Sequence, residues 1–349
     1  MMYRVLQGDC LAVLPTLDAD SIDAVVTDPP AGISFMGRTW DGDHGGRNLW
    51  IAHMQQIAAE VLRVCKPGAH ALVWALPRTS HWTATAWENA GWTVKDRVSH
   101  LFGTGFPKSH DVSKGIDKAA GATRKIIGTQ KLMGKARVLT GGNYTGNYDE
   151  RVLRDSVNIT APATAKAHQW EGWGTALKPA CEDWWLFRKP LIGTVAANVL
   201  AHGTGALNIK ASRVPNAAET GVPLYVPAEG RWPSNLTHDG SDEILTAFAV
   251  YGEQASGSLA RFFYCAKISK AERAGNKHPT AKSLALMRYL CTLITPTGGT
   301  ILDPFAGSGT TLQAAKELGF NAIGIELDTD YVKTCRQRLR TTRLRTHCK

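Results

Sequence analysis

The sequence contains seven cysteines but no CxxC pair, which argues against a zinc site or a disulfide framework. No apolar run approaches the length that spans a bilayer, and the first residues, MMYRVLQGDC, lack an apolar signal segment. We therefore expect a cytoplasmic protein with neither a membrane partner nor a metal. Acidic residues are also in deficit, because 40 Lys and Arg face 30 Asp and Glu, for a formal net charge of +10. This balance favours an acidic partner, and nucleic acid is the commonest one.

The first hundred residues alternate apolar strand patterns with helical ones, and the last seventy repeat that rhythm. Such alternation predicts an α/β fold with a doubly wound, mostly parallel sheet. The chain of 349 residues, 44% of them hydrophobic, can build a large core. Between the two regular parts lies a basic stretch rich in Gly and Thr, which is either a solvated insertion or a surface that faces nucleic acid.

These changes of pattern and composition along the sequence divide the chain into five expected segments. Two α/β halves lie at the ends, and between them come the basic insertion, an apolar strand in EDWWLFRKP that is expected to form a hairpin at the edge of the sheet, and a loop-rich region. The boundaries are 1–102, 103–180, 181–190, 191–275 and 276–349.

An early strand in DAVVTDPPAG ends at Asp28, because Pro29 and Pro30 have no backbone N–H and cannot extend a ladder. The carboxyl ends of strands in open α/β sheets line the ligand crevice, so Asp28 is placed to meet a substrate. Taken alone, the same residues also fit a rigid turn with a solvated acid.

The segment TILDPFAGSGTTLQAAKELGFNAIGIELD predicts a nucleoside site. A strand ends at Asp303, a glycine-rich turn opens a helix, and the next strand ends at Glu326. Glycines allow a ligand to approach the backbone, and the second acid can accept both ribose hydroxyls. The turn lacks the G-x-G-x-x-G spacing that holds a pyrophosphate, which favours an adenosine ligand over a dinucleotide. A purely structural turn is the alternative. The residues of the turn are Phe305, Ala306, Gly307, Ser308 and Gly309.

The motifs DPP, HPT and DPFAGSG, in this order, resemble the permuted class of DNA adenine-N6 and cytosine-N4 amino-methyltransferases. The stretches GTGFPKSHDVSKGID and LKPACEDWWLFRKP look like a phage- and prophage-associated group of these enzymes. The resemblance implies a seven-stranded, Rossmann-like methyltransferase sheet with an antiparallel hairpin at one edge. It also implies S-adenosylmethionine as cofactor, double-stranded DNA as substrate, and a bacterial or phage-infected cell as location. A homodimer and a role in restriction–modification are compatible with it.

The resemblance assigns roles to individual residues. The loop from Asp303 to Gly309 would hold the cofactor, Glu326 its ribose, and Asp28 would border it. Contacts with the methionine end and the adenine ring are implied for a further set: His278, Pro279, Thr280, Asp9 and Cys10.

The same resemblance gives Asp28 and the two prolines a catalytic role. An exocyclic amine is a poor nucleophile because its lone pair is delocalised into the base. Asp28 and the Pro29 carbonyl can accept its two protons in hydrogen bonds and direct the lone pair at a methyl donor. The chain has no Pro-Cys pair, so cytosine C5 chemistry is set aside.

The sequence departs from the family at Ala31, where an aromatic residue normally holds the flipped base. Phe35 and Trp40 lie just downstream and could supply the ring, although packing of the loop is an equal alternative. Asp28 favours adenine N6 on family statistics, with cytosine N4 as the alternative. The loss at Ala31 also leaves open a catalytically silent protein that binds DNA and cofactor. A nicotinamide-dependent oxidoreductase is disfavoured by the missing glycine spacing.

DNA contacts are expected from the middle of the chain. Lys and Arg in the basic insertion would bind phosphates, and residues 191–275 are expected to recognise the target sequence. We expect four tryptophans to pack in the core or a hairpin and not to stack on bases: Trp170, Trp173, Trp184 and Trp185.

Overall fold

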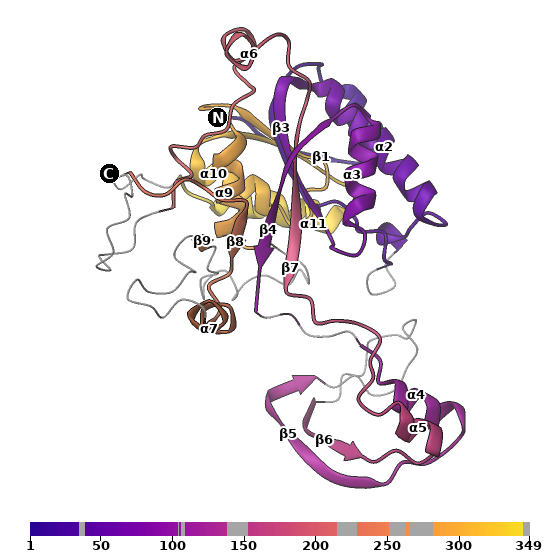
Figure 1. Cartoon of the computed structure of the whole chain (residues 1–349). Coiled ribbons are helices and arrows are strands. Elements are labelled where there is room, and N and C mark those ends of the chain that lie inside the picture. The colour runs from indigo at the N-terminus through magenta and orange to yellow at the C-terminus, as the bar shows by residue number, and fades with distance from the viewer. Residues whose placement is uncertain are drawn as a thin grey trace. The chain divides into compact units, whose positions relative to one another are not determined.

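The computed structural model describes residues 1–34, 39–103, 105, 109–137, 153–214, 229–250, 263–265 and 282–344. The chain divides into two compact units, both visible in Figure 1. The first unit consists of Met1–Ser34, Trp40–Gly103 and Cys181–Lys349, and the second of Phe35–Thr39 and Thr104–Ala180. Among the described residues, no helix is long and apolar enough to cross a membrane.

The first unit is built on a nine-stranded sheet. Every neighbouring pair of strands is parallel except the two pairs made by β7, which runs against both of its neighbours. This confirms the predicted α/β class with a mostly parallel sheet. The strands, in their order across the sheet, are β1 (Tyr3–Gln7), β11 (Asn321–Glu326), β10 (Thr300–Asp303), β2 (Ile22–Thr27), β3 (Cys65–Ala75), β7 (Cys181–Arg188), β4 (Thr93–Leu101), β8 (Leu236–His238) and β9 (Tyr264–Cys265).

Helices cover both faces of this sheet (Figure 1). The helices α2 (Arg47–Val64) and α3 (Ser80–Asn89) lie on one face. On the other face lie α9 (Leu284–Ile294), α10 (Thr310–Leu318) and α11 (Thr329–Thr341). The shorter elements of this unit are α1 (Cys10–Val13), η1 (Leu14–Thr16), η3 (Thr39–Asp41), α6 (Val195–His202) and α7 (Asp242–Val250).

Alternating side chains of the strands divide the core into two clusters. On β3, Leu72 packs with α9 and α10, whereas Ala71 and Val73 pack with α2 and α3. On β7, Trp184 packs in the cluster of α9 and α10, and Phe187 packs in the cluster of α2 and α3. Because successive side chains of a strand point to opposite faces, a strand buried on both faces needs apolar residues throughout. The continuous apolar runs of β2, β3 and β7 meet this need.

Two details of the predicted sheet were wrong. The sheet has nine strands where seven were expected, because the short β8 and β9 extend it beyond β4. The strand in residues 181–190 is antiparallel as expected, but it lies inside the sheet between β3 and β4 and not at an edge. Its backbone groups pair on both sides, with β3 and with β4, whereas an edge position would have left one row of them unpaired.

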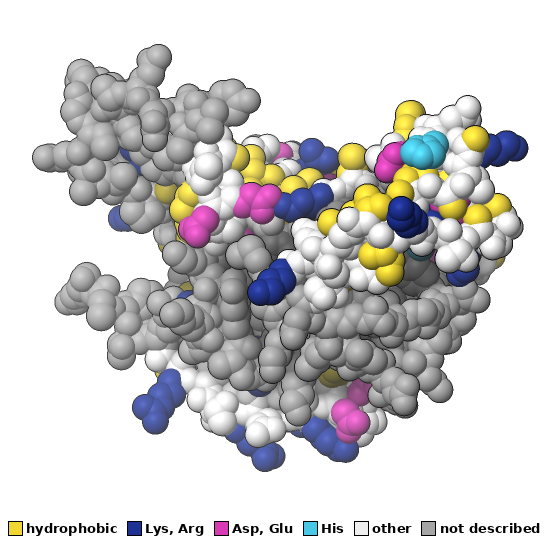
Figure 2. All heavy atoms as spheres, turned by 90° about the horizontal axis from the view of Figure 1, so that it is seen from below, with side chains coloured by type: hydrophobic (Ala, Val, Ile, Leu, Met, Phe, Trp, Pro, Cys, Tyr) yellow, Lys and Arg dark blue, Asp and Glu magenta, His cyan; other side chains and the backbone are white. Residues whose placement is uncertain are grey.

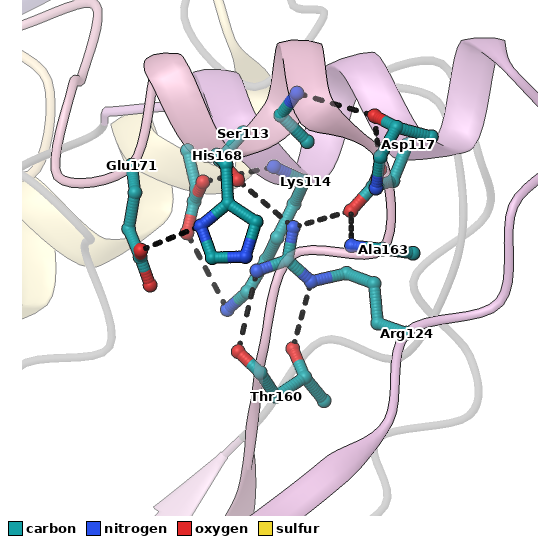
Figure 3. Close-up of polar contacts among 11 residues, drawn as sticks. Ser113, Lys114, Asp117, Arg124, Thr160, Ala163, His168 and Glu171 are labelled. Atoms are coloured by element: carbon teal, nitrogen blue, oxygen red, sulfur yellow. Dashed lines mark hydrogen bonds and ion pairs between the residues drawn. The ribbon is translucent and has the colours of Figure 1, made fainter.

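The second unit joins two helices to a two-stranded sheet. The helices α4 (Val112–Ala119) and α5 (Ala165–Gln169) pack together, and β5 (Ile126–Arg137) pairs antiparallel with β6 (Leu153–Thr160). Asp117 of α4 organises the unit, and its side chain is 1% exposed. It accepts hydrogen bonds from Arg124 Nη1 at 2.7 Å and from the Ala163 N–H at 2.9 Å (Figure 3).

Arg124 ties this network to the neighbouring segments. Its guanidinium also donates to Ser113 Oγ at 3.0 Å and to Thr160 Oγ1 at 3.0 Å (Figure 3). The hydrogen bonds that Asp117 accepts hold the pKa of this carboxyl below its usual range. A satisfied polar network therefore joins α4 to β6 and to the segment before α5.

Two tryptophans of this unit are not in the core, contrary to the expectation from sequence. Trp170 is 43% exposed and Trp173 is 59% exposed, and their rings meet edge to face at 5.0 Å. Trp184, in contrast, is fully buried in the sheet of the first unit. The turn after α5 thus presents an aromatic pair at the surface.

Candidate functional site

Four acids follow four adjacent parallel strands. Asp9 follows β1, Glu326 ends β11, Asp303 ends β10 and Asp28 follows β2. Because the carboxyl ends of parallel strands lie at one edge of a sheet, the fold gathers four side chains that are up to 317 positions apart in sequence. The chain leaves β10 toward β11 on one side and leaves β2 toward β3 on the other. The edge between β10 and β2 is therefore a topological switch point, where ligands of such sheets bind.

Asp303 fixes this switch point from within. Its side chain is buried, and its Oδ1 accepts hydrogen bonds from Thr27 Oγ1 at 2.7 Å and from the Phe305 N–H at 3.1 Å. Burial raises the pKa of Asp303 to about 6, against the opposing effect of these hydrogen bonds. In this structure Asp303 joins the end of β2 to the start of the glycine-rich loop.

The glycine-rich loop turns tightly onto β11. The Ala306 N–H donates to the Ile325 carbonyl at 2.9 Å. Gly307 and Gly309 have φ values of +51° and +85°, a backbone region that side chains with a Cβ rarely adopt. A Cβ added at Gly309 would also collide with Cys335 Sγ on α11. Both glycines are thus required for the path of the loop.

Glu326 faces this loop from the end of β11. Its Oε2 accepts a 2.7 Å hydrogen bond from the Gly307 N–H, and its Oε1 accepts one of 2.8 Å from the Asp328 N–H. Burial raises the pKa of Glu326. Each carboxylate oxygen has a second lone pair, so both can still accept a hydroxyl proton. A glycine-rich loop, which has few side chains to keep a ligand from its backbone, fits an adenosine when it lies beside an acid that can accept the two ribose hydroxyls.

The first strand of this edge ends in a capped helix. Asp9 Oδ1 accepts a 2.8 Å hydrogen bond from the Leu11 N–H and caps α1. Cys10 is buried, and its burial, together with the nearby Asp9, raises the pKa of the thiol to about 12. A thiol with this pKa stays protonated near neutral pH, so Cys10 offers no nucleophile.

Asp28 lies beside a lysine that the sequence reasoning missed. Lys282 Nζ is 3.4 Å from Asp28 Oδ2 and 3.4 Å from Glu182 Oε2. The same ammonium lies 3.8 Å from the centroid of the Trp74 ring. Burial raises the pKa of Asp28 to about 7, Lys282 opposes this shift, and Glu182 and Asp303 add to it. Asp28 therefore titrates close to neutral pH.

The loop after the two prolines is held by buried partners. Asp41 is 2% exposed, and its Oδ1 accepts hydrogen bonds from the Ala31 N–H at 2.5 Å and the Gly32 N–H at 3.1 Å. The Thr79 hydroxyl donates to the Ala31 carbonyl at 3.0 Å. The backbone around position 31 is thus fixed independently of the Ala31 side chain.

The predicted aromatic replacements have different outcomes. Trp40 is 47% exposed, so its ring remains accessible to a ligand. Phe35 lies outside the described residues, as do His278, Pro279 and Thr280. The described part of the loop-rich region 191–275 adds α6, α7, β8 and β9, and much of the rest also lies outside.

Three residues of this site had weak signals in the sequence. Lys282 stands two positions after the HPT motif, and Glu182 opens an apolar strand, but charge alone gave no reason to pair them. Asp41 stands in a loop rich in Asp and Gly and looks like an ordinary turn acid. Among the described residues, no three His, Cys, Asp or Glu side chains gather in a way that could hold a metal ion.

Comparisons with known proteins identify the family of this chain. A family model described as "DNA methylase" matches residues 150–337. The chain is 24% identical over 364 residues to the Type II methyltransferase M.HindIII of Haemophilus influenzae, covering 93% of this chain and 91% of that protein. It is 46% identical over 70 residues to the Type II methyltransferase M2.DpnII of Streptococcus pneumoniae, covering 20% of this chain and 26% of that protein.

A solved structure shares the fold. The PvuII DNA methyltransferase, described as cytosine-N4-specific, superposes with a TM-score of 0.51 at 14% identity, covering 96% of this chain and 85% of that chain. At this identity the likeness concerns the architecture of the sheet and its helices.

Proposed function

Because this chain belongs to the DNA methylase family, we propose that it methylates N6 of adenine at specific sites in double-stranded DNA. S-adenosylmethionine is the cofactor, and when bound it supplies an electrophilic methyl group on a positively charged sulfur. The observation that carries the proposal is the placement of Asp28 at the switch point beside the glycine-rich loop and Glu326. The first unit thus combines a nucleoside site and an acceptor acid on one sheet edge.

The residues of this edge suit the cofactor by their chemistry. Glu326 would accept the ribose hydroxyls, and the loop from Phe305 to Gly309 would lie against the nucleoside. Asp9 and Cys10, at the end of β1, would border the adenine ring. Acidic side chains around the site favour a ligand with a positive centre. Asp303 would act through the loop that it holds, because its Oδ1 already has two partners within the protein.

Asp28 and the Pro29 carbonyl would orient the target amine. Each accepts one amine proton in a hydrogen bond, which localises the lone pair on the nitrogen and makes it a better nucleophile. The methylated nitrogen must then lose a proton, and Asp28 can accept it because its pKa lies at about 7. No thiolate takes part, since the described cysteines near the site are buried and protonated.

A base inside a duplex cannot reach this edge, so it must leave the stack and be held outside it. Trp40, in η3, is exposed close in sequence to the loop that Asp41 fixes, and it is our candidate for the ring that stacks on the base. Stacking on an aromatic ring contributes roughly 1–3 kcal/mol. This role would compensate for Ala31.

The second unit is our candidate for contacts with DNA phosphates. Residues 104–180 contain 12 Lys and Arg against 6 Asp and Glu. Asp117 is buried against Arg124, so it does not neutralise the surface. Figure 2 shows Lys and Arg side chains interspersed with hydrophobic ones on the described surface of one face. Exposed lysines that make no ion pair with any residue the structure describes include Lys118, Lys125, Lys131 and Lys166.

Finer features of the resemblance stay proposals. They are the permuted order of the motifs, a phage or prophage origin, recognition of the target by residues 191–275, and placement of His278, Pro279 and Thr280 at the methionine end of the cofactor. We also propose a cytoplasmic location in a bacterial cell, where the DNA substrate lies.

The test is methyl transfer to DNA that contains every short sequence context, followed by mass spectrometry of the nucleosides. We expect N6-methyladenine with the wild-type chain and none with Asp28→Asn. N4-methylcytosine would overturn the choice of base. An absence of any methylated nucleoside, from protein that binds the cofactor by calorimetry, would overturn the enzyme.

A catalytically silent binding protein is a second candidate, and Ala31 is the observation that favours it. Residue 31 makes its hydrogen bonds to the side chains of Asp41 and Thr79 through its own backbone N–H and carbonyl, so Ala31→Tyr leaves them in place. If the chain is silent for lack of a ring, this variant gains methyl transfer. If Trp40 supplies the ring, wild type is active and Trp40→Ala loses at least about fivefold in rate, which corresponds to the lower end of a stacking contact.

A further inference from the structure

Resting on the proposed function, we propose that Lys282 is a positioning residue that keeps Asp28 in its carboxylate form, and that Glu182 limits this effect by sharing the ammonium. Neither residue was expected to belong to the site. The pair acts on the acceptor acid rather than on the base or the methyl group.

The geometry makes Lys282 a bridge. Its ammonium lies 3.4 Å from a carboxylate oxygen of Asp28 and 3.4 Å from one of Glu182, and its side chain is only 10% exposed. Asp28 follows β2 and Glu182 belongs to β7, and these strands flank β3 on either side. One cation therefore joins acids from two strands that do not pair with each other.

Two features fix the ammonium in place. The Trp74 ring, on the intervening β3, lies 3.8 Å from Nζ and attracts the positive charge through its face. Ser283, the next residue, caps α9 by accepting a hydrogen bond from the Leu286 N–H at 3.4 Å. The lysine thus extends from the start of a helix onto an aromatic surface, and its position is set by both.

The charge balance explains why the bridge affects the acid. Asp28 Oδ2 faces the ammonium, while Oδ1 makes no hydrogen bond or ion pair with the residues that the structure describes. One oxygen is thereby held, and the other is left to accept the proton of an amine. With one cation between two carboxylates, each acid receives less stabilisation than it would alone.

The remaining charged neighbours are few. Asp303 also faces Asp28 and disfavours its ionisation. His100 of β4 faces Glu182, and burial lowers the pKa of this histidine to about 4, so it is neutral near pH 7. Its Nδ1 lies 2.9 Å from Thr237 Oγ1. The groups that set the ionisation of Asp28 are therefore Lys282, Glu182 and Asp303.

Opposite changes at the two partners give a test that a merely structural ion pair would not satisfy. Lys282→Met removes the cation, which should raise the pKa of Asp28 by at least about one unit. Glu182→Gln removes the competing acid, which should lower it. Lys282→Arg keeps the charge and is the conservative control.

The experiment reads the Asp28 carboxyl directly by NMR titration of the cofactor-free protein. We expect a midpoint near pH 7 in wild type, a higher one in Lys282→Met and a lower one in Glu182→Gln. The single-turnover rate of methyl transfer should fall on the acidic side of its pH profile. The midpoint of this fall should move to higher pH in Lys282→Met and to lower pH in Glu182→Gln. At pH values below the Asp28 midpoint of wild type, Lys282→Met should be at least about tenfold slower than wild type. A pKa that is one unit higher lowers the ionised fraction of Asp28 about tenfold there.

Several outcomes overturn the inference. They are an unchanged Asp28 midpoint in both charge-removing variants, midpoints that move in the same direction, or a Lys282→Met variant whose only defect is weaker cofactor binding by calorimetry. If Lys282→Met does not fold, the Asp28 midpoint in Glu182→Gln is the deciding measurement. The inference requires this midpoint to lie at lower pH than in wild type. The titration needs no activity, so it stays decisive even if wild type transfers no methyl group.

Discussion

The hydroxyl of Thr27 donates a 2.7 Å hydrogen bond to Asp303 Oδ1, joining residues 276 positions apart at the ends of β2 and β10. These two strands begin the segments proposed to hold the base and the cofactor. Their register is parallel, with Ile301 beside Ala24. Beside the pairing of the two strands, a buried side-chain hydrogen bond therefore links the two halves of the proposed reaction at the switch point of the sheet.

Thr27→Val tests this link. The change keeps the shape of the side chain but leaves Asp303, already buried, without one of its donors, which should lower the free energy of unfolding by about 1–3 kcal/mol. Cofactor affinity should fall as well, because the loop that Asp303 anchors is loosened. Chemical denaturation and calorimetry measure the two effects. Thr27→Ser, which keeps the hydroxyl, is the control, and equal losses in the two variants would contradict the role of the bond.

Gly309→Ala tests the loop. The change forces a Cβ onto a residue with φ of +85° and into Cys335, so we expect a loss of stability greater than about 1 kcal/mol and weaker cofactor binding. Gly298→Ala is a matched control, because Gly298 has φ of +73° but open space around its Cβ position. Thermal unfolding should therefore show a smaller loss in the control. Equal melting temperatures for the two variants would show that the contact with Cys335 is unimportant.

Asp28→Asn should stabilise the protein while it abolishes methyl transfer. Folding raises the pKa of Asp28 from 3.8 to about 7, so the folded state binds the proton more tightly than the unfolded state does. The stability that this proton binding provides is full below about pH 4 and is lost as pH rises through about 7. Asn stays neutral throughout. Above pH 7 the variant should therefore be more stable than wild type, on the order of 4 kcal/mol.

Denaturant titrations of both proteins between pH 4 and 8 measure this difference. The curves should diverge as pH rises. Parallel curves would mean that Asp28 ionises normally in the folded protein, and the account of its charged neighbours would fail with it.

Lys118→Gln combined with Lys166→Gln tests the second unit as a DNA surface. These exposed lysines stand on α4 and α5, which pack together. If both contact phosphates, the slope of log affinity against log salt should fall by about 2, since each contact contributes about 0.9. The control replaces exposed Lys95 and Lys333 of the first unit in the same way. Fluorescence anisotropy with a duplex at several salt concentrations gives both slopes, and equal slopes would remove the second unit from the DNA interface.

The sequence was informative wherever chemistry depends on strand ends. Asp28, Asp303 and Glu326 each follow an apolar run, and parallel topology then brings their strands together at one edge. The glycine-rich loop was equally legible, because positive φ values require glycine at Gly307 and Gly309. Whether these residues act as proposed stays a prediction.

Long-range pairing explains what the sequence could not show. The strand containing Trp184 reads as a short apolar strand wherever it lies, and only its pairing with both β3 and β4 places it inside the sheet. The contacts of Lys282 with Asp28 and Glu182 join three distant segments, and no periodicity connects them. Trp170 and Trp173 are large hydrophobic residues, which predicts burial, but they lie in the turn after α5, where the structure exposes both rings.

The most direct test of the central claim is long-read sequencing of genomic DNA from a methylation-free bacterial host that expresses this chain. We expect N6-methylated adenines in one short sequence motif, and we expect them to disappear when the host expresses Asp28→Asn instead. Unmodified DNA from cells with folded, cofactor-binding wild-type protein would contradict it.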